Sequence, residues 1–242
     1  MFFALLAIIF TAPALAQKDA GNCSECNADR AIELNPQDAI GWYIKGIALD
    51  NQSKYDEAIA AFDKAIELNA NYTLALNKKG MIHYNRGEYD DAIKAFDQAI
   101  RIDPHFADAW NNKGSVLGSQ EKYDNAIEAF DNAIEIDPQF ADAWNNKGIV
   151  RGSQNKYDEA IKAFDKAVEI KPQYINAWYN KGITLSRQGN YDEAVKAFDK
   201  VIELEPQLGD AWFKKANALK MLGNSTGADA AFAHAKELGY SG

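Results

Sequence analysis

The sequence predicts an all-α solenoid of about six helical hairpins, each 34 residues long. Aromatic residues recur at a fixed interval, prolines recur at the same interval, and neighbouring segments are close copies of each other. Segments 107–140 and 141–174 are identical at 25 of 34 aligned positions. Agreement at one period between unrelated residue types is the signature of a repeat architecture.

Four residue types carry the period. All five tryptophans fall on one register, and Leu76 occupies the place between the first two. The tryptophans are Trp42, Trp110, Trp144, Trp178 and Trp212. The phenylalanines that follow them are Phe62, Phe96, Phe130, Phe164, Phe198 and Phe232. Tyrosines recur at Tyr55, Tyr89, Tyr123, Tyr157 and Tyr191, and prolines at Pro36, Pro104, Pro138, Pro172 and Pro206.

The first half of each repeat has the pattern of an amphipathic helix. In segment 141–174, Trp144, Gly148 and Arg151 lie at i, i+4 and i+7, which places them on one helical face. A glycine on that face allows close approach of another helix. Residues 152–155, Gly-Ser-Gln-Asn, carry turn signals.

The second half of the repeat predicts another helix. It starts near Tyr157, and Ala160, Phe164 and Ala167 form its apolar stripe at i, i+4 and i+7. Pro172 ends it, because proline cannot donate a backbone hydrogen bond within a helix. One such hairpin cannot bury its own apolar stripe, so neighbouring hairpins must stack.

The combined pattern of Trp-x-x-x-Gly, Tyr, Ala-x-x-x-Phe-x-x-Ala and a terminal Pro resembles the tetratricopeptide repeat family. The resemblance runs from Ala39 to about Leu238 and implies a right-handed superhelix with a concave groove that binds a protein or peptide. We expect a degenerate half-repeat or N-terminal cap at 17–38 and a repeat domain at 39–242. Its predicted repeats are 39–72, 73–106, 107–140, 141–174, 175–208 and 209–242.

Composition and charge exclude several function classes. The formal net charge is −9 and the pI is about 4.9, and no basic patch offsets this acidity, which argues against nucleic acid as a partner. No nucleophile–base set, phosphate loop or metal-ligand cluster stands out. We therefore expect a protein that is not an enzyme and has no cofactor and no small-molecule substrate.

The first 16 residues differ from the rest of the chain. Residues 1–10 are almost wholly apolar, and Ala14-Leu15-Ala16 precedes Gln17, as at a signal-peptide cleavage site. This pattern predicts a secreted or envelope-associated protein. An uncleaved N-terminal membrane anchor is the main alternative, and a misassigned gene start is another. Membrane contact is expected only through such an uncleaved segment.

Two cysteines, Cys23 and Cys26, form a single Cys-x-x-Cys pair. In an oxidising compartment they could close a small disulfide or remain inert thiols. A bridge between two copies of the chain, or to a partner, is a second interpretation. Metal binding is a weak third, because a structural zinc site needs four ligands.

The face of the first helix opposite the tryptophan register is the predicted ligand surface. By resemblance these positions line the family's groove. The predicted groove residues are Tyr43, Asn77, Lys78, Tyr84, Asn111, Asn112, Ser115, Asn145, Asn146, Ile149, Tyr179, Asn180, Arg187, Phe213 and Lys214.

Asparagine recurs on that face at Asn112, Asn146 and Asn180. A side-chain amide donates and accepts at once, which suits the backbone of an extended peptide. The arrangement is similar to the asparagine ladder in the tetratricopeptide region of O-linked N-acetylglucosamine transferases. The alternative is that these are surface asparagines copied by repeat duplication.

Lysine also recurs, just before each glycine, as at Lys113 and Lys147, and aspartate recurs just after each phenylalanine. We interpret these lysines as solvated and structurally paired rather than as an anion-binding ladder. The sequence thus predicts a protein-interaction scaffold, with a substrate-docking subunit of an enzyme complex, such as a protein glycosyltransferase, as the alternative. It leaves the oligomeric state open.

Overall fold

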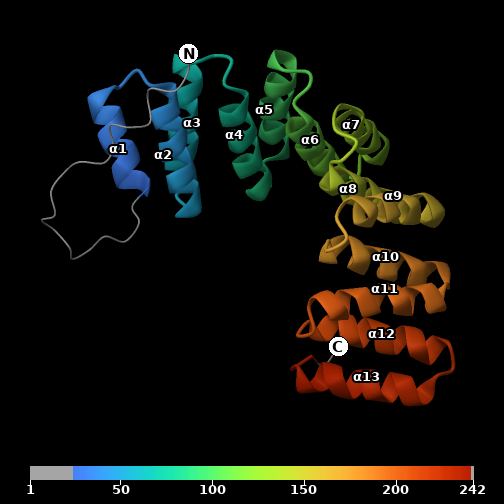
Figure 1. The fold of residues 1–242 in the computed structure, drawn as a ribbon. Coiled ribbons are helices and arrows are strands. Elements are labelled where there is room, and N and C mark those ends of the chain that lie inside the picture. Colours follow the sequence, from blue (N-terminus) through green and yellow to red (C-terminus); the bar gives the residue numbers. More distant parts are fainter. Residues whose placement is uncertain (1–23, 241–242) are drawn as a thin grey trace, which may run out of the picture. The chain divides into compact units, whose positions relative to one another are not determined.

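A computed structural model describes residues 24–240, with side chains from residue 29 onward, and every regular element in this range is an α-helix (Figure 1). The all-α fold class is therefore confirmed. The predicted leader, Cys23 and the side chain of Cys26 lie outside the described residues. The helices are α1 (Ser24–Leu34), α2 (Ala39–Asn51), α3 (Tyr55–Leu68), α4 (Thr73–Asn85), α5 (Tyr89–Ile102), α6 (Ala107–Ser119), α7 (Tyr123–Ile136), α8 (Ala141–Ser153), α9 (Tyr157–Ile170), α10 (Ile175–Gln188), α11 (Tyr191–Leu204), α12 (Gly209–Met221) and α13 (Ser225–Glu237).

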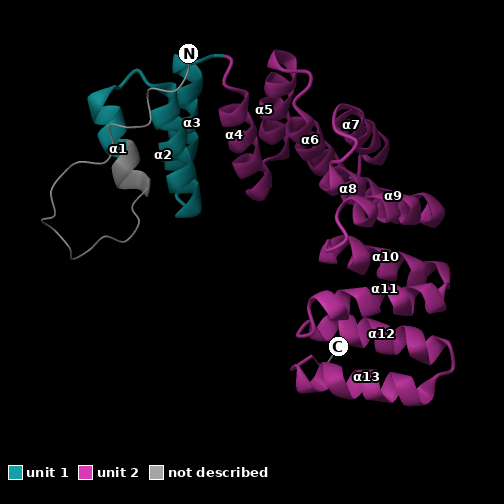
Figure 2. Ribbon diagram, viewed as in Figure 1, with its two compact units in different colours: residues 1–70 teal, residues 71–242 magenta. Residues whose placement is uncertain are grey.

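The chain divides into two compact units, residues 1–70 and residues 71–242 (Figure 2). In unit 1, α2 packs against both α1 and α3. The single helix α1 therefore precedes the first complete hairpin, and an ion pair of 2.8 Å between Asp29 Oδ1 and Lys45 Nζ joins α1 to α2.

Unit 2 is a stack of five hairpins. Its helices pair in chain order, α4 with α5 through α12 with α13, and each first helix after α4 also packs against the second helix of the hairpin before it. The first helices α4, α6, α8, α10 and α12 contact each other in sequence and so form one continuous layer. Within the described residues, no helix is both long and apolar enough to cross a lipid bilayer.

A phenylalanine ring lies directly on a glycine backbone inside each hairpin except the last. A Cβ atom built at Gly148 would lie 2.6 Å from Cε1 of Phe164, well inside van der Waals contact. The same contact occurs at Gly46, Gly80, Gly114 and Gly182. The five phenylalanines that meet these glycines are almost completely buried. Glycine is thus required here because only a residue without a Cβ lets the ring approach the helix so closely.

The last hairpin departs from this arrangement. Ala216 stands at the glycine position, and Phe232 is only partly buried. Phe232 packs instead against Phe213, with ring centroids 5.4 Å apart, and Tyr240, which follows α13, also contacts Phe213 with ring centroids 5.2 Å apart. The last described hairpin therefore contains an aromatic cluster in place of the glycine contact.

The five tryptophans tie their hairpins to the segment before them, and the hairpin of α4 and α5 has Leu76 in this place. Every indole Nε1 donates a hydrogen bond of 2.9–3.2 Å to the carbonyl of the proline six residues earlier. A lysine ammonium lies 5.2–5.6 Å above each of these rings and forms an ion pair of 2.5–2.8 Å with an aspartate of the preceding helix. The pairs are Lys45–Asp29, Lys113–Asp97, Lys147–Asp131, Lys181–Asp165 and Lys215–Asp199. These five lysines are structurally paired, as the sequence indicated.

The turn inside each hairpin needs a left-handed residue. Gly87, Gly189 and Gly223 fill this position with φ of 75°–86°, whereas the equivalent position in the other hairpins holds a residue with a side chain, at φ of 59°. Those residues are Ser53, Glu121 and Asn155. A side chain in this region costs about 1–2 kcal/mol relative to glycine.

We predict that Gly148→Ala lowers the free energy of unfolding by about 1–3 kcal/mol, because the new methyl group overlaps the Phe164 ring. Gly152→Ala, four residues further along the same helix, is the matched control. Its Cβ would meet no atom closer than 3.7 Å, and alanine favours helix, so this change should be neutral or stabilising by up to about 1 kcal/mol. Urea unfolding followed by circular dichroism measures both. Equal effects of the two changes would contradict the close-approach account.

Candidate functional site

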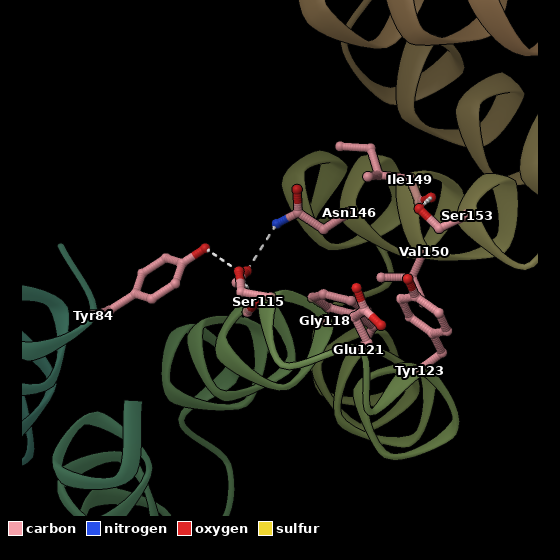
Figure 3. Close-up of a pocket in the computed structure, with 11 residues that line it drawn as sticks. Tyr84, Ser115, Gly118, Glu121, Tyr123, Asn146, Ile149, Val150 and Ser153 are labelled. Carbon is pink, nitrogen blue, oxygen red and sulfur yellow. Dashed lines mark hydrogen bonds between the residues drawn. The ribbon is translucent and has the colours of Figure 1, made fainter. Parts of the chain in front are cut away.

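Two pockets open on the layer of first helices in unit 2. The first, which we call the Glu121 pocket, has a volume of about 360 Å³ (Figure 3). It is lined by Tyr84, Ser115, Gly118, Ser119, Glu121, Tyr123, Phe130, Asn146, Ile149, Val150 and Ser153. The second, the Arg187 pocket, also measures about 360 Å³. It is lined by Ile183, Ser186, Arg187, Tyr191, Phe198, Lys214, Asn217, Ala218 and Met221.

The two pockets occupy equivalent places in the repeat. Every lining residue of the Arg187 pocket lies two 34-residue repeats after a lining residue of the Glu121 pocket. The floor is the same in both, with Tyr123 and Phe130 matching Tyr191 and Phe198. The stack therefore presents one type of cavity twice, with different side chains on its walls.

Hydrogen-bond acceptors line the Glu121 pocket. The hydroxyl groups of Ser119 and Ser153 each donate to the carbonyl four residues earlier on their own helix, at 3.1 Å. The Tyr84 hydroxyl lies 2.9 Å from Ser119 Oγ and must then be the donor in that pair. The serine oxygens thus keep lone pairs for a ligand, and the Glu121 carboxylate adds the only charge among the lining residues.

Cations line the Arg187 pocket. Arg187 and Lys214 contribute two positive charges, and no lining residue is acidic. Lys214 Nζ lies 3.9 Å from Oδ1 of Asp210, one helical turn away on α12. Met221 lies at the edge of the pocket and is 62% exposed. This pocket combines positive charge with apolar surface.

A continuous network of asparagine amides links four hairpins beside these pockets. Asn112, Asn146 and Asn180 each donate from Nδ2 to an asparagine of the preceding hairpin, at 3.0–3.1 Å. The acceptors are Asn77, Asn111 and Asn145. Two longer bonds within hairpins, of 3.3–3.5 Å, join these steps, from Asn111 to Asn112 and from Asn145 to Asn146.

The three acceptor asparagines are not open to a ligand. Asn77, Asn111 and Asn145 are 4–7% exposed, so they lie between the hairpins rather than on the groove surface. Their amides serve the packing, and we leave them out of the candidate ligand-contact set. The donor asparagines are half-buried, and each has a second N–H. Asn146 directs one toward Ser115 Oγ at 3.5 Å, and both side chains line the Glu121 pocket.

Several predicted groove residues have structural partners. The Tyr179 hydroxyl donates to Asp210, and burial together with this hydrogen bond raises the pKa of Tyr179. Phe213 belongs to the terminal aromatic cluster. Tyr43 lies in unit 1, where its ring centroid is 5.8 Å from that of Phe62. Lys78 is half-buried on α4 and lines neither pocket.

Of the predicted groove residues, Tyr84, Ser115, Asn146 and Ile149 line the Glu121 pocket, and Arg187 and Lys214 line the Arg187 pocket. The prediction covered first-helix positions alone, so it did not include the lining residues from the turn and from the second helix. Glu121 is the clearest example. Its signal was available, since it holds a place where three other hairpins have glycine.

Comparison with known proteins identifies the class. The profile of the tetratricopeptide repeat family matches residues 39–72, 77–139, 141–174 and 175–208. The chain therefore belongs to the tetratricopeptide repeat family. Proteins of this family are generally non-catalytic scaffolds that bind peptides or proteins, and membership of the family supports a protein-interaction scaffold here.

Solved structures show the same fold. YrrB, described as a tetratricopeptide protein with an unusual peptide-binding site, is 27% identical, with a TM-score of 0.57 over 76% of this chain and 95% of YrrB. MamA is 31% identical, with a TM-score of 0.60 over 67% of this chain and 95% of MamA. The type IV pilus biogenesis factor PilW is 24% identical, with a TM-score of 0.75 over 84% and 94%. Comparison with curated proteins gives no match.

Within the described residues, no group of acidic, histidine or cysteine side chains could hold a metal ion.

We predict that Asn146→Ala lowers the free energy of unfolding by about 1–3 kcal/mol, because it removes the donor to the buried Asn111 amide. Asn176→Ala, at an exposed position on α10, is the matched control and should stay within about 0.5 kcal/mol of wild type. Chemical denaturation measures both. A loss no larger than that of the control would mean that the network contributes nothing to stability.

Proposed function

We propose that unit 2 binds an extended peptide segment of a partner protein along its layer of first helices. The observation that supports this most directly is the repetition of one cavity at equivalent places in the stack. A single pocket suits a compact ligand, whereas two matched pockets on one continuous layer suit side chains spaced along one chain.

The polar groups beside the pockets support the same proposal. Asn112, Asn146 and Asn180 recur once per hairpin along this layer, and each has a second amide N–H besides the one that the network uses. That of Asn146 points toward Ser115 Oγ at the pocket, at 3.5 Å. An extended peptide has an unpaired carbonyl at each residue, so evenly spaced donors can bind it whatever its side chains.

The test is selection of random peptides by display on the full purified chain, followed by fluorescence anisotropy with the enriched peptides. Ser119→Phe and Ser186→Phe place a large side chain in the Glu121 and Arg187 pockets, respectively. Each change should weaken binding of the selected peptides at least tenfold, about 1.4 kcal/mol.

Ser225→Phe is the matched control, because Ser225 is exposed at the start of α13 and lines neither pocket. It should leave affinity unchanged, and thermal unfolding should show that all three variants fold. Peptides that bind both pocket variants as tightly as wild type would contradict binding on this layer.

We further propose that the protein acts outside the cytoplasm. The support is the sequence alone: an apolar segment at residues 1–10 and the Ala14-Leu15-Ala16 motif that precedes Gln17. In such a compartment a groove of this kind would meet partners of the cell envelope or secreted proteins.

Purified native protein should therefore begin at Gln17, as determined by N-terminal sequencing or intact mass. Replacing Ala16 by a bulky residue, as in Ala16→Phe, should block processing, because cleavage sites require small residues. Native protein that retains Met1 would contradict cleavage and favour the uncleaved anchor.

A further inference from the structure

We infer that the peptide ligand is charge-ordered: a basic side chain occupies the Glu121 pocket and an acidic side chain of the same peptide occupies the Arg187 pocket. This inference rests on the proposed peptide-binding function and specifies its ligand. It follows from a comparison of the two pockets position by position.

The walls of the two pockets differ in charge where the repeat places equivalent residues. The matched pairs of lining residues are Ser119 with Arg187 and Asn146 with Lys214. Glu121 matches Gly189, which does not line the second pocket. The second pocket has two cations where the first has neutral side chains, and it has no counterpart of the Glu121 carboxylate. The two pockets therefore share one geometry but carry opposite charges.

The Glu121 pocket suits an ammonium or guanidinium group, which only donates hydrogen bonds. Its serine hydroxyls use their protons on their own helices and offer oxygen lone pairs. Figure 3 places the Glu121 carboxylate beside Gly118 and Tyr123, within the ring of lining residues. Tyr84 and Tyr123 add aromatic faces, which attract cations, and Ile149 offers apolar surface to an alkyl stem.

The turn between α6 and α7 places this glutamate at the pocket. Glu121 has φ of 59°, at the position that Gly189 holds two repeats later. A residue with a side chain is strained there, so the carboxylate enters the pocket at a cost in backbone conformation. Ser53 and Asn155 hold the equivalent position with the same φ, so the strain belongs to the turn, and Glu121 differs from them because its side chain lines the pocket.

The Arg187 pocket suits a carboxylate. Arg187 presents a planar, permanently charged donor fork that matches a carboxylate in two hydrogen bonds, and Lys214 adds a second positive charge. Asp210 lies near Lys214, but its carboxylate also accepts from the Tyr179 hydroxyl, and it lines neither pocket. Ile183 and Met221 cover the aliphatic part of an acidic side chain.

The repeat also sets the spacing of the two charges. The pockets lie two first-helix steps apart, and packed helices are about 10 Å apart, so the span is about 20 Å. An extended chain advances about 3.3 Å per residue, so the basic and acidic side chains should be about six residues apart.

The test extends the display selection on the full chain. Peptides enriched by the wild-type protein should carry Lys or Arg about six residues from Asp or Glu, in one order. Glu121→Lys and Arg187→Glu should each weaken the best such peptide about tenfold, and Glu121→Gln, which keeps the side-chain size, should weaken it less. A peptide whose basic residue is replaced by Glu should bind the Glu121→Lys variant with restored affinity and should bind the wild-type protein weakly.

Glu135→Lys and Arg101→Glu make the same charge changes at exposed positions on α7 and α5 outside the pockets, and should change affinity less than twofold. Failure of the charge swap at the Glu121 pocket, unchanged binding to Arg187→Glu, or enriched peptides without the paired charges overturns the charge order. If those peptides are still blocked by Ser119→Phe, the proposed peptide binding stands. A selection that enriches no peptide overturns both.

Discussion

The close approach of a phenylalanine ring to a glycine backbone is the constraint on which the stack depends. It brings the two helices of a hairpin together so tightly that the ring is fully buried, as Phe164 is against Gly148. Each hairpin then has a fixed shape, and the faces it presents to its neighbours are fixed as well. The tryptophan–proline hydrogen bonds and the lysine–aspartate ion pairs add polar links at the joints between hairpins. Isolated surface ion pairs contribute little, so we assign the main role to the packed rings.

The asparagine network shows how a polar group can serve both the joint and the surface. Asn145 is buried and accepts from Asn180, while Asn146 on the same helix faces the groove and donates to the preceding hairpin. Buried amides require such partners, because an unsatisfied polar group in the interior is costly. Substitutions in the network therefore change stability as well as surface chemistry, which makes the pocket walls better probes of binding.

Much of the fold was predictable from the sequence, because the 34-residue period fixes helix positions and core residues together. Trp144, Gly148 and Phe164 identify one hairpin, and the period extends it to the others. The site was only partly predictable. A helical register distinguishes the tryptophan face from its opposite, but it cannot tell that Asn111 is covered by the next hairpin while Asn112 is not. Burial at that level depends on how hairpins stack. Glu121 was missed because a turn has no helical register, although its left-handed position is visible once the hairpins are aligned.

The equivalence of the two pockets separates what keeps this protein folded from what distinguishes its ligands. Tyr123 and Phe130 recur unchanged as Tyr191 and Phe198 beneath walls that carry opposite charges. Wall residues can therefore change while the supporting framework stays the same, and a duplicated hairpin can acquire a new preference without a new core. Such a chain has independent sites of variation on a shared frame, so its recognition properties can evolve, or be engineered, one repeat at a time.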